Sequence, residues 1–335
     1  MNKETFVNME KLMSGLGLGN IIKEPVCVNG GLLHKMYHVT TTDGEYAIKV
    51  LNPEIMKRPD ALSNMINSER IAKAFENRIP LVRAMEFEGK QIQCLETGYF
   101  LVFPWVQGSS VFAKDITAKH CKVIGEILGK IHQSRLQVEG VLQEERSFGM
   151  FEWEYYKQCL NSMKYEKQWA IEYEKAICDI INWNRKACDA GGYLSSVQVI
   201  SHRDLDPKNV MWNENKAYVI DWEAAGYINP FQELLEVVNY WCDDGTGEIE
   251  QDKFDPFMAE YCKYMKLEGV NWEAVFNGSY TGMLGWLEYN VKRALGIEIS
   301  DESEIALGEE QVIGTLKELY SYQEKAKKIK VWIGG

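Results

Sequence analysis

The chain has 335 residues, of which 46% are hydrophobic and 26% are charged, so it is long enough for about two domains or lobes with a well-buried core. Its formal net charge of −12 argues against nucleic-acid and anionic-membrane partners and is compatible with cationic ones. The longest apolar stretch, Tyr99 to Val106, is far shorter than the ~20 residues of a membrane helix, and the N-terminal segment lacks the apolar core of a signal peptide.

The first hundred residues have the pattern of an antiparallel sheet with one helix. Thr42-Asp43-Gly44 joins two β-rich runs, and Asp-Gly is a strong hairpin signal. A helical apolar stripe begins after Asp60, a good N-cap residue, and Pro104 ends the last strand pattern. The predicted elements are strands 35–41, 45–51, 91–96 and 99–104, and a helix over 60–75.

After Gly108 the pattern becomes mainly helical. A glycine pair, Gly191-Gly192, is predicted to close a long helix, and Asp301 to Glu310 reads as an exposed acidic turn. The predicted elements are helices 117–134, 151–163 and 168–190, short strands 197–201, 210–212 and 217–220, and further helices between 231 and 328. The sequence therefore predicts an α+β fold with two lobes, residues 1–106 and 107–335.

The most informative segment reads S-H-R-D-L-D-P-K-N-V from Ser201 to Val210, and a short apolar run after it ends in Asp221. Phosphoryl transfer from a nucleotide requires a carboxylate that orients the acceptor hydroxyl and takes its proton. It also requires an amide and a second carboxylate that hold Mg²⁺ against the triphosphate. The alternative is a solvated turn rich in Asp and Asn, but the apolar strands flanking both pieces favour the catalytic interpretation.

This pattern resembles the protein-kinase-like superfamily, and within it the aminoglycoside phosphotransferase and choline kinase families. The resemblance implies a small antiparallel-sheet N-lobe and a larger helical C-lobe. It also implies that His202 braces the catalytic loop, that Asp204 is the catalytic base, and that Asn209 and Asp221 hold Mg²⁺.

The stretch after the metal residue also resembles these families, with two departures. They often have Asp where this chain has Asn229 and Glu233. Protein kinases differ more. Ser/Thr kinases have Lys at the position that Asp206 occupies in this chain. Protein kinases have Phe-Gly after their metal-binding Asp, whereas Trp222 follows Asp221 here, and this chain has no later A-P-E segment. A small-molecule acceptor is therefore predicted.

Two upstream residues fit the same interpretation. Lys49 shares a strand face with Ala47 and Leu51, and a Lys flanked by apolar residues is expected to bind an anion. Glu69 lies on the apolar stripe of the 60–75 helix, where a charge should be paired. The resemblance pairs such a Lys with such a Glu and places the Lys at the α- and β-phosphates. The alternative is that Lys49 reaches solvent and Glu69 sits at the edge of the stripe.

The nucleotide, ATP or GTP, has two further predicted contacts. The turn at Asn29-Gly30-Gly31 would cover the phosphates, because glycine lets the backbone approach closely. The segment from Phe103 to Val106 resembles the adenine-binding hinge, where Pro104 can give its carbonyl and Val106 its N–H. The cluster Gly15 to Gly19 follows no strand, so a helix end and loop is predicted rather than a dinucleotide fingerprint.

The acceptor is predicted to be a small hydroxyl compound, either an aminoglycoside bound through charge pairing or choline, ethanolamine or another small alcohol. A non-catalytic nucleotide-binding module is the alternative from a different functional class. The residues proposed for acceptor binding are Asp206, Glu223, Asp243, Trp286, Glu288, Asn290 and Arg293. Each of them could instead be a core or solvated residue.

The eight cysteines form no C-x-x-C pair and no zinc-site spacing with histidine. Buried, reduced thiols in a cytoplasmic protein are therefore expected, without a structural metal. His132, at a predicted helix end, is expected to be structural rather than catalytic.

Overall fold

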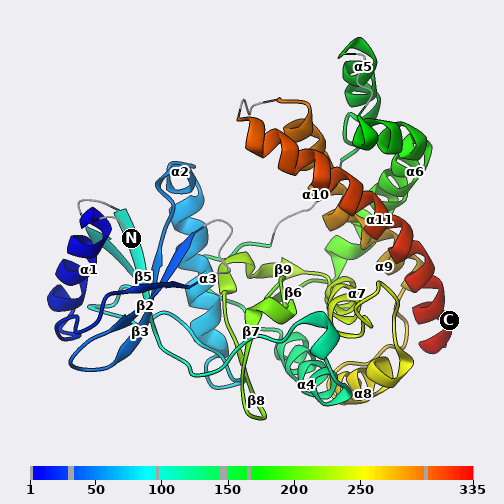
Figure 1. The fold of residues 1–335 in the computed structure, drawn as a ribbon. Helices are drawn as coiled ribbons and strands as arrows, with labels where there is room; N and C mark the ends of the chain where they lie inside the picture. Colours follow the sequence, from blue (N-terminus) through cyan, green and yellow to red (C-terminus); the bar gives the residue numbers. More distant parts are fainter. Residues whose placement is uncertain are drawn as a thin grey trace. The chain divides into compact units, whose positions relative to one another are not determined.

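A computed structural model describes residues 3–28, 34–95, 98–143, 149–163, 167–297 and 301–334 (Figure 1). Its contacts divide the chain into two compact units. Unit 1 contains 1–115, 133–142 and 200–226, and unit 2 contains 116–132, 143–199 and 227–335. The single boundary at 106/107 predicted from the sequence leaves 200–226 with the second half, whereas the contacts group this segment with the first.

Unit 1 is built on a five-stranded sheet of order β1-β2-β3-β5-β4, in which every neighbouring pair is antiparallel. Its strands are β1 (Val26–Val28), β2 (Lys35–Thr40), β3 (Glu45–Val50), β4 (Ile92–Leu95) and β5 (Gly98–Pro104). The predicted hairpin is confirmed, because Thr41 N–H donates to Gly44 O at 2.8 Å in the β2–β3 turn. The four predicted strands are present within one or two residues, and β1 adds an edge.

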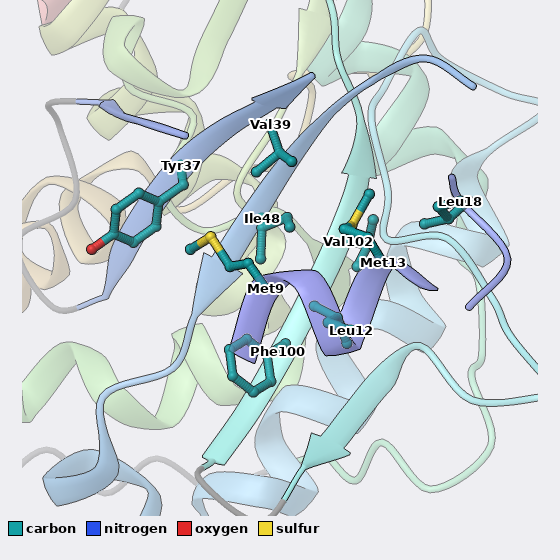
Figure 2. Packing of buried hydrophobic residues seen from close by; sticks show 9 residues of the cluster. All are labelled: Met9, Leu12, Met13, Leu18, Tyr37, Val39, Ile48, Phe100 and Val102. Atoms are coloured by element: carbon teal, nitrogen blue, oxygen red, sulfur yellow. The ribbon is translucent and has the colours of Figure 1, made fainter. Parts of the chain in front are cut away.

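Helix α1 (Lys3–Gly15) covers one face of this sheet; its end near Gly15 was predicted, but its extent was not. Its side chains Met9, Leu12 and Met13 are buried, and they pack in one cluster with Ile48 and its neighbours on the sheet (Figure 2). The spacing i, i+3, i+4 is the only helical signal in this short segment. The loop predicted around Gly15 to Gly19 is confirmed, since the helix ends at its first glycine.

The opposite face of the sheet carries Lys49. Its cross-strand partner is Leu101, and side chains alternate along a strand, so both point away from α1. Leu101 packs there against Met65 of α3 (Ala61–Phe75). Asp60 precedes α3 as predicted, although its side chain makes no capping hydrogen bond. A short helix, α2 (Pro53–Met56), was not predicted.

Short strands and single turns organise the segment around the H-x-D-x-x-x-x-N motif. They are β6 (Val199–Ser201), η2 (Pro207–Asn209), β7 (Val210–Asn213), β8 (Lys216–Val219), η3 (Trp222–Ala224) and β9 (Gly226–Ile228). Strands β7 and β8 pair as an antiparallel hairpin. Trp222 of η3 stacks on Phe75 of α3, with ring centroids 5.5 Å apart, and so attaches this segment to the helix beneath the sheet.

Unit 2 is helical, as predicted. Its helices are α4 (Ala118–Ser134), α5 (Trp153–Met163), α6 (Gln168–Ser196), α7 (Pro230–Trp241), α8 (Gln251–Tyr261), α9 (Trp272–Gly278), α10 (Tyr280–Ala294) and α11 (Glu302–Trp332). A further turn, η1 (Ala113–Asp115), ends the first segment of unit 1. Among the described residues, none of the helices has both the length and the apolar character needed to cross a membrane.

Two predictions for the helical half were wrong. Helix α6 continues through Gly191-Gly192 to Ser196, because the buried Leu194 packs directly on Gly278 of α9 and this contact outweighs the low helix propensity of glycine. The acidic segment from Asp301 is not a turn but the start of α11. The Asp301 carboxylate accepts the Ser303 and Glu304 N–H groups at 3.0 and 3.1 Å, and acids stabilise the first turn of a helix.

Candidate active site

The loop after β6 is held by its own side chains. Asp206 accepts the Lys208 N–H at 2.8 Å and caps η2, and Pro207 occupies the first position of that turn. Asn209 is buried, and its amide Nδ2 donates to both the backbone O and the Oδ2 of Asp204 at 2.9 Å. The Asp204 carboxylate is therefore fixed through Oδ2, and its Oδ1 takes no part in the bond with Asn209.

His202 connects this loop to the second acidic segment. It is fully buried, its Nε2–H donates to Ile220 O at 2.9 Å, and its Nδ1 accepts the Asp204 N–H at 3.3 Å. Both contacts require the neutral ring with the proton on Nε2. The ring also packs edge-on against Trp222 at 4.8 Å. These contacts connect His202 to both loops, and its bracing role stays a prediction.

Asp221 stands at the turn after β8 in a left-handed conformation, with φ 58° and ψ 67°. Asp is one of the few non-glycine residues that adopt this conformation readily. Ile220 N–H donates to Asn209 O at 2.9 Å, which ties the two loops together. Asp221, Asn209 and Asp204 therefore belong to one hydrogen-bonded segment of unit 1.

Lys49 reaches this segment from the sheet. Its Nζ lies 2.9 Å from Asp221 Oδ1 and 2.6 Å from Glu223 Oε2. Burial disfavours the Lys49 ammonium, but the Asp221 and Glu223 carboxylates outweigh this effect and raise its pKa. The expected ion pair between Lys49 and Glu69 is replaced by these two contacts.

Glu69 has a different partner. Its Oε2 accepts the Ala84 N–H at 3.0 Å, and the side chain is buried. Burial raises its pKa to about 7, against the opposing effects of the Ala84 hydrogen bond and the positive charge of Lys49. A carboxyl group with this pKa is only partly ionised near neutrality, whereas Lys49 bonds to the carboxylates of Asp221 and Glu223.

Glu223 and His34 form a contact that the sequence did not reveal. His34 is buried, its Nδ1 accepts the Asn52 N–H at 2.9 Å, and its Nε2–H donates to Glu223 Oε1 at 2.9 Å. Burial opposes ionisation of Glu223, but the bonds from His34 and Lys49 outweigh it and lower its pKa to about 2. Glu223, proposed above for the acceptor, is thus a permanent anion bound to Lys49.

The predicted hinge is formed by the C-terminal end of β5 and the residues after it. Phe103 is paired with Ala47, and Trp105 N–H donates to Glu45 O at 3.1 Å. Because backbone groups alternate between the two edges of a strand, the carbonyl of Pro104 lies on the edge away from β3. Val106 lies two residues after Pro104, and the roles of both in base recognition remain predictions. Gly30 and Gly31 lie outside the described residues.

The acceptor residues predicted in unit 2 are engaged within that unit. Asp243 accepts from Lys325 Nζ at 2.8 Å through one oxygen and from Gly245 N–H at 2.6 Å through the other. Glu288 accepts from Tyr156 OH at 2.5 Å and lies 2.6 Å from Lys292 Nζ. Both carboxylates are therefore already paired with a lysine and a second hydrogen-bond donor of unit 2.

Helix α10 does not present its predicted row of side chains on one open face. Trp286 is 44% exposed and stacks on Tyr289, with centroids 5.5 Å apart. Asn290 is fully buried and donates to Trp286 O at 2.8 Å, and the buried Arg293 pairs with Glu304 of α11. Asn290 and Arg293 thus support the packing of α10 with α11.

The two departures at Asn229 and Glu233 have a structural explanation. Asn229 accepts the Phe231 N–H at 3.0 Å as the cap of α7 and also donates to Val197 O at 3.0 Å, which a carboxylate could not do. Glu233 accepts from the buried His132 at 2.7 Å. The expectation that His132 is structural agrees with this burial.

The donor set fits a hard divalent cation. The amide nitrogen of Asn209 donates to Asp204, so the single side-chain oxygen of Asn209, Oδ1, can serve a cation. Asp221 accepts from Lys49 through Oδ1, so its second oxygen, Oδ2, can do the same. Mg²⁺ is commonly held by one or two protein oxygens together with substrate phosphates. The described residues contain no cluster of three or more His, Cys, Asp or Glu side chains suited to a metal.

Comparison with known proteins places this geometry in a family. The sequence profile described as the phosphotransferase enzyme family matches residues 27–258. No curated protein matches the sequence.

Solved structures share the fold. A spectinomycin phosphotransferase in complex with ADP and spectinomycin is 12% identical, with a TM-score of 0.66 over 95% of this chain and 98% of its own. The Plasmodium vivax ethanolamine kinase is 16% identical, with a TM-score of 0.61 over 97% and 91%. A choline kinase from Streptococcus pneumoniae is also 16% identical, with a TM-score of 0.53 over 94% and 99%. With its two-part kinase-like fold and the profile match over most of its length, the chain belongs to the phosphotransferase enzyme family.

Proposed function

We propose that this chain transfers the γ-phosphoryl group of ATP or GTP to a hydroxyl group of a small molecule, with Asp204 as the base. The observation that carries the proposal is the bond from Asn209 to Asp204 Oδ2, which leaves Oδ1 of a fixed carboxylate to take the hydroxyl proton. Lys49 would neutralise phosphate charge from the opposite side.

Asn209 Oδ1 and Asp221 Oδ2 would hold Mg²⁺, which supplies charge neutralisation on the triphosphate when bound. His202 contributes indirectly, because its bonds to Ile220 and Asp204 keep the two loops in register. The Pro104 carbonyl and the Val106 N–H would bind the base. The phosphate contacts proposed for Gly30 and Gly31 complete this arrangement.

For the acceptor we propose a small hydroxyl-bearing amine, with aminoglycosides first and choline or ethanolamine as alternatives. The proposal is supported by the chain's net charge of −12 and by structural neighbours named for spectinomycin, ethanolamine and choline. Because Asp243 and Glu288 are paired within unit 2, we do not assign the recognition of the amine to them.

Mass spectrometry of a small-molecule panel tests this function. The panel contains aminoglycosides, spectinomycin, choline, ethanolamine and homoserine, incubated with protein, Mg²⁺ and ATP or GTP. We expect a phosphate adduct on one compound, and we expect Asp204→Asn to lose that adduct while retaining nucleotide binding. If the adduct persisted in Asp204→Asn, the assigned base would be wrong. Nucleotide binding with no adduct on any compound would favour the non-catalytic alternative.

A further inference from the structure

Lys208 is the cation nearest to Asp204 among the ion pairs of the described residues, and no role has been given to it so far. Its Nζ lies 3.6 Å from Asp204 Oδ1 and 3.5 Å from Asp206 Oδ2. The contacted oxygen of Asp204 is the one that Asn209 leaves open, because the amide bonds to Oδ2. The ammonium therefore lies beside the atom at which proton transfer would occur.

The backbone around Lys208 is fixed although its side chain is 59% exposed. The residue lies in η2, where Pro207 sets the first position and Asp206 accepts the Lys208 N–H at 2.8 Å. A spacing of four residues along this turn directs the lysine back over Asp204. The side chain can therefore move between Asp204 and a nearby anion while its Cα stays in place.

Stability does not explain this arrangement. An exposed ion pair contributes little to stability, and the Lys208 contacts of 3.6 and 3.5 Å are longer than those of a hydrogen-bonded ion pair. Lys49, in contrast, is bonded at 2.6 and 2.9 Å to Glu223 and Asp221 and serves that side of the site. Lys208, instead, lies beside Asp204 and Asp206.

We propose that Lys208 is a catalytic residue that stabilises the charge of the phosphoryl group in flight, an inference that rests on the proposed function. In the step, the bond from the γ-phosphorus to its bridging oxygen breaks and a bond to the acceptor oxygen forms. The hydroxyl proton passes to Asp204 Oδ1, and Lys208 keeps its own proton throughout. Its ammonium moves from Asp204 to an equatorial phosphoryl oxygen as negative charge leaves the carboxylate.

The test compares Lys208→Met, Lys208→Arg and the control Lys216→Met, which removes an exposed lysine of β8 in the same unit. Turnover is measured with the acceptor found in the panel, or as ATP hydrolysis by water if none is found. We expect Lys208→Met to lower kcat by about 10- to 100-fold with little change in KM for ATP. Lys208→Arg should recover most of this loss, and Lys216→Met should match the wild type.

A second readout does not require the acceptor. Aluminium fluoride with Mg²⁺ and ADP imitates the phosphoryl group in flight, so its complex should weaken in Lys208→Met by a similar factor, while ADP binding and the melting temperature stay unchanged. Equal weakening of ADP and of ADP–aluminium fluoride, or wild-type turnover in Lys208→Met, would overturn the proposal. If Asp204→Asn retained full turnover, the proposed function itself would fail, which is a separate outcome.

Discussion

At the scale of single residues, Glu69 and Glu223 show how one unit shifts two carboxyl groups in opposite directions. Both are largely removed from water, but Glu223 receives bonds from His34 and Lys49, whereas Glu69 receives one backbone N–H. The pKa of Glu223 falls to about 2 and that of Glu69 rises to about 7. The number and charge of the donors therefore decide the sign of the shift.

The raised pKa of Glu69 predicts a pH-dependent stability. The pKa of Glu69 in the folded protein, about 7, exceeds its ordinary value of 4.5. The contribution of this carboxyl group to the free energy of unfolding is therefore fully present below pH 4.5 and is lost as the pH rises through 7. The neutral isostere Glu69→Gln should match the wild type near pH 4.5 and exceed its free energy of unfolding at pH 8, by at most roughly 3 kcal/mol.

Urea unfolding between pH 4.5 and 8 measures this effect, with the exposed Glu54→Gln as the control. Glu223 does not interfere, because its lowered pKa contributes stability that is lost only as the pH falls from 4.5 toward 2. If the free energies of unfolding of the wild type and of Glu69→Gln changed in parallel across this pH range, Glu69 would not have a raised pKa.

At the scale of elements, helix α4 passes very close to α8. A Cβ added at Gly125 would lie 2.2 Å from the backbone oxygen of Phe257, and neither backbone can move independently of its helix. Glycine at this position is therefore required by the contact rather than by the conformation of α4.

Substitution of two helical glycines by alanine should have opposite effects. Gly125→Ala should lower the free energy of unfolding by about 1–3 kcal/mol because α4 and α8 must separate. Gly192→Ala, in α6, adds a Cβ that meets nothing within 4 Å and should raise it by about 0.5–1 kcal/mol through helix propensity. Chemical denaturation of both variants checks this pair, and destabilisation by Gly192→Ala would show that α6 is not a regular helix there.

The elements near the motif were predictable because their signals are local. The β2–β3 hairpin follows from Asp43-Gly44 and alternating side chains, and the catalytic loop follows from the spacing of Asp204 and Asn209. The extent of helix α1 was missed because only Met9, Leu12 and Met13 mark it, and their burial depends on a sheet formed later in the chain. A sequence pattern predicts a helix or strand reliably when the element it packs against is close in the sequence.

Side-chain pairing was less predictable than the fold. Lys49 bonds to residues more than 170 positions away, and the nearer candidate, Glu69, is satisfied by the backbone of Ala84. His34 and Lys208 were not singled out, although Lys208 is four residues after the predicted base. Neither its contact with Asp204 nor that of His34 with Glu223 follows from helical or strand periodicity.

At the scale of the whole molecule, the chain passes repeatedly between the two units. Unit 1 requires 200–226 in addition to its first 115 residues. A fragment of residues 1–115 should therefore bind Mg·ATP at least about tenfold more weakly than the full chain, because it lacks Asn209, Asp221 and Glu223. Isothermal titration of both proteins measures this, and equal affinity would show that the first segment holds the site alone.

The position of Lys49 between Asp221 and Glu223 has a consequence for the order of assembly. A triphosphate that arrives without a divalent cation must compete with two carboxylates for a single ammonium, and it brings further negative charge to them. A cation held by Asp221 would lessen both effects, since it would compete with Lys49 for Asp221 and offset the repulsion. Nucleotide and metal should therefore show positive heterotropic cooperativity, each raising the affinity for the other by the same factor.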